Sequence, residues 1–184
     1  MPIRIKGAAF FQLLYAYEKA CGAAFRASVI ERVRGRGGDA LRRNEILASS
    51  TVPVDWYVAM LHAAAELSGA GLVFTQRMGH DSAAHDIGTI HRLVFRLLSV
   101  DTIVRQVPRI LSLYYDGGRG EVIAHERGRI RLRFRDFFGF DGHAWHDLAG
   151  GCQAMLEATG AAKVRSRLVS GGETDHAELE VTYR

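Results

Sequence analysis

The chain has 184 residues, the length of one domain, and 48% of them are hydrophobic. With 24% charged residues and only 3 prolines, this composition excludes a disordered or fibrous protein. The 24 lysines and arginines exceed the 20 acidic residues by four, which is too small an excess to indicate nucleic-acid binding. We therefore expect a single domain over residues 1–184.

A hydrophobic period of 3.6 residues predicts about six helices in residues 1–115. The expected helices are 7–21, 23–34, 54–67, 72–84, 86–98 and 99–114. The segment 35–44 contains three glycines and three arginines, which predicts a mobile loop. Pro108 lies inside the last helix and either kinks it or begins a second, shorter one.

After Tyr115 the period changes to 2, which predicts strands at 121–126, 130–134, 164–168 and 177–183. A helix over 143–159 is expected between the second and third strands. The region 116–184 is therefore a β-β-α-β-β antiparallel sheet unit. The whole chain is predicted to be an α+β protein with a helical N-terminal part.

The two cysteines, Cys21 and Cys152, lie far apart and form no C-x-x-C motif, so a cytoplasmic location is expected. Arg4 and Lys6 precede an apolar stretch as in a secretory leader, but its hydrophobic residues recur at helical spacing. No run approaches the roughly 20 apolar residues of a membrane-spanning helix. We expect no membrane span.

Arginines occupy alternate positions of the predicted hairpin and of the third strand, opposite the apolar residues. They are Arg127, Arg129, Arg131, Arg133, Arg135, Arg165 and Arg167. Glu178 and Glu180 of the last strand fall on the same face. This face is either solvated, with cross-strand Arg–Glu pairs, or the surface for a protein partner. Because no aromatic residues alternate with the arginines there, nucleic acid is the least favoured partner.

The histidines permit several interpretations. His91 lies at the edge of an apolar face, where it either ligates haem iron or bonds within the core. His62 lies on a polar line and is expected to be exposed. Two groups combine histidines with aspartates as metal ligands or as residues at helix ends: His80, Asp81, His85 and Asp86, and Asp141, His143, His146 and Asp147.

Motifs for catalysis are missing from the sequence. It contains no HExxH, no G-x-S-x-G and no P-loop, so we expect neither a catalytic residue nor a metal site. Gly150 and Gly151 lie together inside the predicted helix 143–159, where each costs about 1 kcal/mol relative to alanine. A neighbouring element or a ligand is expected to approach the helix closely there.

Short motifs and their layout make the chain similar to a known superfamily. The motifs are Lys6-Gly7, Pro53-x-x-Trp56, Gly79, Gly88, Val107-Pro108-Arg109, Gly150-Gly151 and Ala158-Thr159-Gly160-Ala161. The chain resembles the superfamily that joins haem NO-binding domains, 4-vinyl-reductase-type small-molecule-binding domains and TRAPP vesicle-tethering subunits. More closely, it resembles a paralogous family of myxobacterial proteins within it.

The resemblance implies a domain that binds a ligand or a partner without chemistry of its own. The haem-binding branch carries a proximal histidine and a Tyr-x-Ser-x-Arg signature that grips the haem propionates. This sequence has no Tyr-x-Ser-x-Arg. It also lacks the cysteine cluster by which some 4-vinyl-reductase-type domains hold zinc.

We therefore predict a non-enzymatic small-ligand-binding or signalling domain that forms a homodimer. An apolar pocket for a small apolar or aromatic ligand is expected between the helices and the sheet. Its expected lining is Trp56, Met60, His91, Phe95, Phe134, Phe138 and Trp145. The alternatives are a haem-based gas sensor that uses His91 and a TRAPP-like scaffolding module that uses the helix 7–21 and the exposed arginines.

Overall fold

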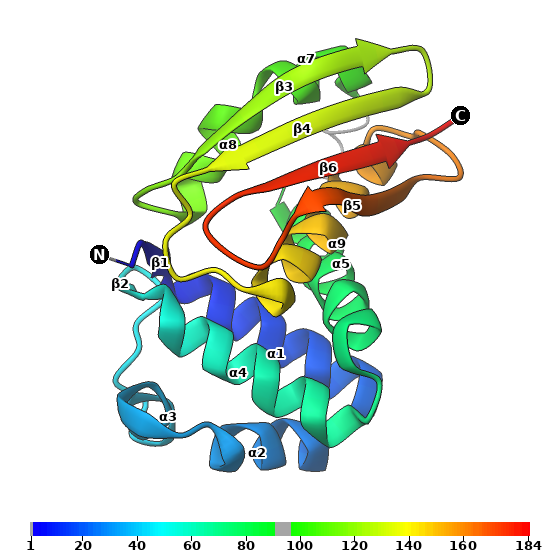
Figure 1. Cartoon of the computed structure of the whole chain (residues 1–184). Helices are drawn as coiled ribbons and strands as arrows, with labels where there is room; N and C mark the ends of the chain where they lie inside the picture. Colours follow the sequence, from blue (N-terminus) through cyan, green and yellow to red (C-terminus); the bar gives the residue numbers. More distant parts are fainter. Residues whose placement is uncertain (1, 91–96) are drawn as a thin grey trace.

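A helical part and a four-stranded sheet make up the computed structural model, which describes residues 2–90 and 97–184 (Figure 1). The helices are α1 (Gly7–Cys21), α2 (Ala23–Arg32), α3 (Gly35–Arg42), α4 (Val54–Ser68), α5 (Gly71–Ile90), α7 (Val100–Arg105), α8 (Val107–Tyr114) and α9 (Gly142–Ala158). The strands are β1 (Arg4–Lys6), β2 (Thr51–Pro53), β3 (Arg119–Glu126), β4 (Arg129–Arg135), β5 (Arg165–Gly171) and β6 (Ala177–Thr182). This architecture confirms the predicted α+β class.

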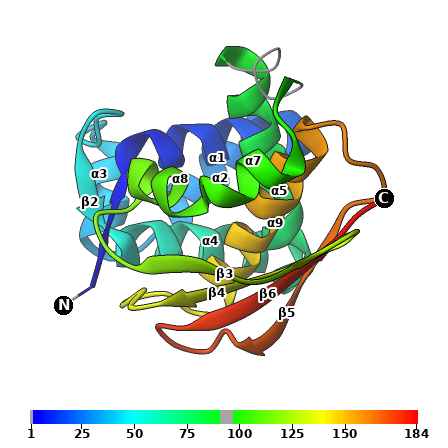
Figure 2. The ribbon, with the colours of Figure 1, turned by 90° about the horizontal axis from the view of Figure 1, so that it is seen from above.

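The large sheet is antiparallel, with strand order β3-β4-β6-β5. Its apolar face points toward the helices, which all lie on one side of it in the described chain (Figure 2). Ile130, Leu132 and Phe134 of β4 are at most 3% exposed, as are Leu179 and Val181 of β6. The alternation predicted from the sequence is therefore confirmed, and the opposite face carries the charged residues.

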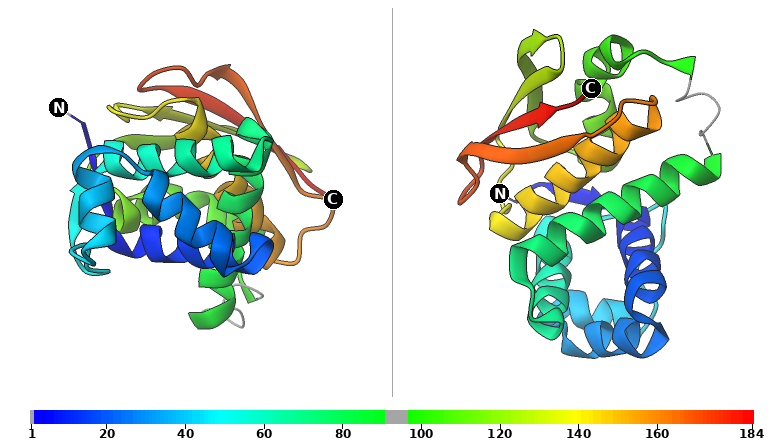
Figure 3. Two further views of the ribbon diagram at one scale, coloured as in Figure 1. Left: turned by 90° about the horizontal axis from the view of Figure 1, so that it is seen from below. Right: turned by 90° about the vertical axis from the view of Figure 1, so that its right-hand side faces the viewer.

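Helix α9 crosses α5 and joins the sheet to the helical part (Figure 3). Glycines make this crossing close. A Cβ at Gly150 would lie 2.6 Å from the backbone nitrogen of His80, and the carbonyl oxygen of Gln76 would be closer still. A Cβ at Gly79 would lie 2.7 Å from Oδ1 of Asp147. A helix therefore makes the predicted close approach at Gly150, whereas a Cβ at Gly151 would lie 3.9 Å from its nearest neighbour, Cβ of Ala83.

Two predictions about the helical part are wrong. The segment expected to be a mobile loop forms α3, whose glycines permit close packing, because a Cβ at Gly37 would lie 2.7 Å from Cβ of Trp56. The break expected at residue 85 is absent, because α5 continues from Gly71 through this position to Ile90. Ser82 and Ile87 of this helix are buried. Burial of their face stabilises a continuous helix and outweighs the preference of His80, Asp81, His85 and Asp86 for helix ends.

Pro108 lies in the first turn of α8, so the alternative of a second, shorter helix is confirmed. Strands β1 and β2 pair with each other beside the starts of α1 and α4, and the sequence analysis did not predict them. Within the described residues no single helix is long and apolar enough to cross a membrane. Helix α4 and residues Gly71–Ile87 reach that length and composition only as a pair bent by 118°.

Candidate functional site

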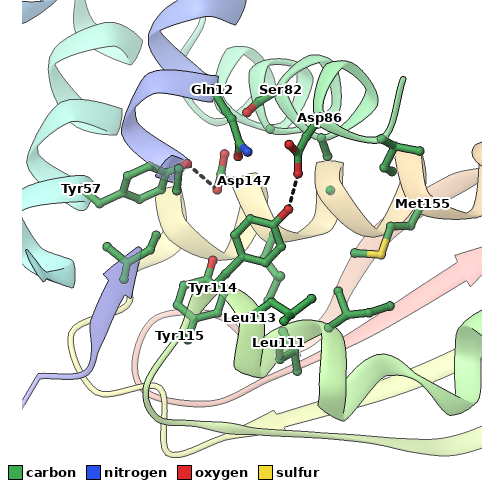
Figure 4. Close-up of a pocket in the computed structure, with 18 residues that line it drawn as sticks. Gln12, Tyr57, Ser82, Asp86, Leu111, Leu113, Tyr114, Tyr115, Asp147 and Met155 are labelled. Atoms are coloured by element: carbon green, nitrogen blue, oxygen red, sulfur yellow. Dashed lines mark hydrogen bonds between the residues drawn. The ribbon is translucent and has the colours of Figure 1, made fainter. Parts of the chain in front are cut away.

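A cavity of about 250 Å³ lies where α1, α4, α5, α8 and α9 meet (Figure 4). We call it the central cavity. Most of its wall is apolar or aromatic, with a few polar groups, as is typical of small-ligand sites. Its lining residues are Ile5, Ala9, Gln12, Tyr57, Gly79, Ser82, Ala83, Asp86, Ile87, Ile110, Leu111, Leu113, Tyr114, Tyr115, Asp147, Leu148, Gly151 and Met155.

Asp147 on α9 is the buried acid of this cavity, at only 8% exposed. Its Oδ2 accepts a hydrogen bond from the hydroxyl of Tyr57 at 3.1 Å. Its Oδ1 is buried and has no hydrogen-bond partner among the described residues. Burial raises the pKa of Asp147 from 3.8 to about 7, although the Tyr57 hydrogen bond acts in the opposite direction. A buried carboxylate oxygen without a partner is costly, so a ligand that donates to it would be stabilised.

The helix geometry explains why Asp147 is buried. Asp147 precedes Gly150 and Gly151 by three and four residues, so it shares the face of α9 that crosses α5. Gly79 on α5 leaves the space in which Oδ1 lies. From the sequence, Asp147 was grouped with Asp141, His143 and His146, as metal ligands or as residues at a helix end. Its spacing from the two glycines was the signal that could have shown it to be buried.

A second acid, Asp86 on α5, lines the same cavity and accepts a hydrogen bond from the hydroxyl of Tyr114. Burial, followed by this hydrogen bond, raises the pKa of Tyr114. Gln12 and Ser82 contribute an amide and a hydroxyl at the same end of the cavity (Figure 4). Among the lining residues of the described chain, none is lysine, arginine or histidine. The polar end of the cavity is therefore acidic.

A smaller hollow of about 30 Å³ lies beside the central cavity, beneath the sheet. The two share Ile110, Leu111, Leu148 and Met155. Every other residue that lines the hollow is also apolar or cysteine: Ile103, Val104, Val107, Ile130, Leu132, Phe134, Cys152, Leu156 and Val181. Burial raises the pKa of the Cys152 thiol to about 12, so the thiol is neutral and this end is uncharged.

The residues predicted to line a pocket lie in several places. Phe134 lines the smaller hollow. Met60 and Trp145 are fully buried, and the Trp145 ring packs 5.9 Å from the Phe134 ring. Trp56 packs against α3, and Phe138 is 46% exposed. The remaining two, His91 and Phe95, lie outside the described residues.

The histidines that invited a metal interpretation link helices instead. His62 of α4 bonds to Asp141, which also caps α9 by accepting from the backbone nitrogens of His143 and Ala144. The Nδ1 atoms of His143 and His146 bond to Thr75 and Gln76 of α5, at 2.9 and 3.0 Å. His80 bonds to Asp81 and Glu157, and the ring of His85 stacks on Tyr15. No group of three metal-ligating side chains occurs in the described part of the chain.

The predicted arginine face is largely paired with glutamates. Glu180 is 4% exposed, and its carboxylate lies 2.6 Å from both Arg129 and Arg167 and 3.5 Å from Arg131. Hydrogen bonds from Arg167 and Arg129 lower the pKa of Glu180 to about 2. Arg133 bonds to Glu178 at 2.8 Å. Arg135 and Arg165, at opposite ends of their strands, are exposed.

Comparisons with known proteins identify the fold. No family profile matches the sequence, and no curated protein sequence matches it significantly. Solved structures do match over nearly the whole length. An H-NOX protein from S. oneidensis in the Fe(II) ligation state has a TM-score of 0.73 at 12% identity, over 97% of this chain and 96% of that chain. The chain has the H-NOX fold.

Two further structures agree. The unliganded Fe(II) H-NOX protein mutant from K. algicida has a TM-score of 0.71 at 9% identity, over 97% of this chain and 96% of that one. An oxygen-binding H-NOX domain related to soluble guanylate cyclases has a TM-score of 0.65 at 10% identity, over 97% and 95%. At such identities the likeness establishes the fold alone.

Haem is the group that this fold implies, and the described lining of the central cavity does not fit it. The cavity, at about 250 Å³, is smaller than the roughly 300–1,000 Å³ of drug-sized ligand sites. The described lining offers carboxylates, which repel propionates, and no basic side chain that would pair with them. The hydroxyls of Tyr57 and Tyr114 already bond to Asp147 and Asp86. The described lining of the central cavity therefore does not favour haem.

Proposed function

We propose that the protein is a small-ligand-binding domain of a sensing or signalling system, with its ligand in the central cavity. One observation carries this proposal: a mainly apolar cavity is lined by an acid with a buried carboxylate oxygen that has no hydrogen-bond partner among the described residues. Folding leaves such a group unpaired only at a cost of about 1–3 kcal/mol, which a bound donor would recover. The H-NOX fold supports the proposal, because the similar structures include a domain that binds oxygen.

A neutral apolar dye, N-phenyl-1-naphthylamine, tests the proposal through its fluorescence increase on leaving water. Ala83 of α5 lines the cavity, so Ala83→Leu should fill part of it. Ala84 is exposed on the same helix, and Ala84→Leu is the matched control. We expect the wild type and Ala84→Leu to bind the dye equally, and Ala83→Leu to bind it at least tenfold more weakly.

Equal dye binding by all three proteins, or no binding by any of them, would contradict the proposal. Native mass spectrometry of gently purified protein provides a second readout. It reports the mass of any ligand that copurifies, and it measures the oligomeric state. We propose a homodimer, and the same spectrum tests that part of the proposal.

Haem-based gas sensing through His91 is the second candidate function, favoured by the likeness to iron-containing H-NOX structures. An absorption spectrum of protein expressed with excess haem decides between the two. The acidic lining predicts no Soret band. A stoichiometric Soret band that disappears in His91→Ala would establish the haem sensor.

The face of β4, β5 and β6 that carries Arg129, Arg131, Arg133, Arg135, Arg165 and Arg167 is the proposed surface for a protein partner. Because Glu178 and Glu180 pair with four of these arginines, the exposed Arg135 and Arg165 are the best placed to contact another protein. Charge reversal at both positions should lower partner recovery in a pull-down. Unchanged recovery would exclude this surface.

A further inference from the structure

The two ends of the central cavity differ in chemistry. At one end Asp147 and Asp86 present carboxyl groups near Gln12 and Ser82, while Leu111, Leu113 and Met155 lie toward the other (Figure 4). No lysine, arginine or histidine faces the acids from the described lining. An anionic ligand would be repelled at the acidic end, whereas a cation would be attracted.

The unpartnered atom defines which cation fits. Oδ1 of Asp147 is a buried acceptor, and the Tyr57 hydroxyl occupies only Oδ2. A protonated primary amine has three N–H donors in a compact head, so it can bond to Oδ1 and still donate to other oxygens of the acidic end. Charge-assisted hydrogen bonds of this kind are roughly twice as strong as neutral ones.

The apolar end defines the rest of the ligand. Leu111 of α8 and Leu148 and Met155 of α9 form an apolar wall of the central cavity, and the smaller hollow behind them has no charged group in the described chain. Leu113 also lines the central cavity and is 61% exposed, so the cavity has an apolar rim. An alkyl chain along this wall would bury its surface at about 25 cal/mol per Å².

We propose that the central cavity binds a small cationic amphiphile, whose protonated amine pairs with Asp147 and whose hydrocarbon chain lies along the apolar side chains of α8 and α9. This inference rests on the proposed function and names its ligand class. It also assigns Asp147 the role of the group that selects the ligand's charge.

Displacement of the bound dye tests the charge preference with probes that share one chain length. The probes are n-octylamine, 1-octanol and octanoate at pH 8.5, where an alkylamine is protonated. We expect octylamine to displace the dye at a concentration at least tenfold lower than octanol, and octanoate to be weaker than both. Equal displacement by octylamine and octanol would overturn the inference and leave the proposed function intact.

Asp147→Asn removes the charge and keeps the shape. In this variant the preference for octylamine over octanol should fall at least tenfold, whereas octanol itself should displace the dye as it does in the wild type. Octanol binding therefore shows that the variant cavity is folded. Glu157→Gln removes an acid from the same helix outside the cavity and should keep the preference. An amine preference that survives Asp147→Asn would overturn the inference.

Discussion

Replacing Asp147 by asparagine should stabilise the protein at alkaline pH. The folded chain raises the pKa of this carboxyl from 3.8 to about 7, because burial disfavours its charged form. A raised pKa means that the folded state binds the proton more tightly than the unfolded state. The stability that this group contributes is therefore complete below about pH 4 and is lost as the pH rises through 7.

The size of the effect follows from the two pKa values. A difference of about 3 pKa units corresponds to roughly 4 kcal/mol above pH 7, at 1.36 kcal/mol per unit. Between pH 5 and pH 8.5 the loss is about 3 kcal/mol, because at pH 5 the unfolded chain has already released this proton. Asparagine keeps an acceptor for the Tyr57 hydroxyl and does not titrate.

The three tyrosine hydroxyls nearest Asp147 do not titrate between pH 5 and pH 8.5. Burial, and then the charge of Asp147, raise the pKa values of Tyr17 on α1, Tyr57 on α4 and Tyr115 after α8. Asp86 faces the same cavity from α5 and is present in both proteins. His143 and His146 precede Asp147 on α9 and have lowered pKa values, but they too are common to both proteins.

Urea unfolding at pH 5 and at pH 8.5 measures the effect in the wild type and in Asp147→Asn. The quantity of interest is the difference in the free energy of unfolding between the two proteins, in which the other titrating groups cancel. We expect this difference to shift by about 3 kcal/mol in favour of the variant at the higher pH. A difference that is the same at both pH values would refute a buried, destabilising carboxylate at position 147.

Three further predictions test the crossing, the sheet and the ligand. Gly150→Ala should destabilise the protein by about 1–3 kcal/mol because its Cβ meets the α5 backbone, whereas Gly151→Ala should stabilise it by up to about 1 kcal/mol. Thermal unfolding measures both effects, and equal effects would contradict the close contact between α5 and α9 at Gly150. Glu180→Gln should lower the free energy of unfolding near neutral pH, and this loss should shrink as the pH falls from about 4.5 toward 2, since the pKa of Glu180 is lowered to about 2. A loss in urea unfolding that does not depend on pH would show that the Arg–Glu180 ion pairs do not stabilise the protein. Octylamine affinity, measured by calorimetry, should fall about tenfold per pH unit below 7 as Asp147 takes up its proton, and a flat profile would contradict pairing with that carboxylate.

The sheet unit could be predicted closely from the sequence because alternation is a local signal. The arginines of β4 and the glutamates of β6 share one face, as their alternation predicts, and the register pairs Arg131 with Glu180 and Arg133 with Glu178. Glycines in the helical part were harder to interpret. The glycines of α3 led to the prediction of a loop because glycine occurs both in mobile turns and where helices pack closely. Only the contact of Gly37 with Trp56 shows that close packing is the reason here.

The candidate site could not be predicted from local sequence patterns, because contacts between distant segments form it. Asp147 lies 90 residues from Tyr57, and the cavity that they share is formed by the crossing of α5 and α9. Large aromatic residues such as Trp145 fill the core, so aromatic content did not locate the cavity. A polar residue three and four positions before paired glycines was the more informative pattern.

The most direct test of the account is a carbon NMR titration of the Asp147 side-chain carboxyl, with and without saturating octylamine. Without the amine we expect a midpoint near pH 7. With it, the ammonium should favour the charged carboxylate and move the midpoint down by at least one pH unit. A midpoint near 4 in the free protein, or one that the amine leaves unchanged, would contradict the claim that Asp147 binds a cationic ligand in a buried cavity.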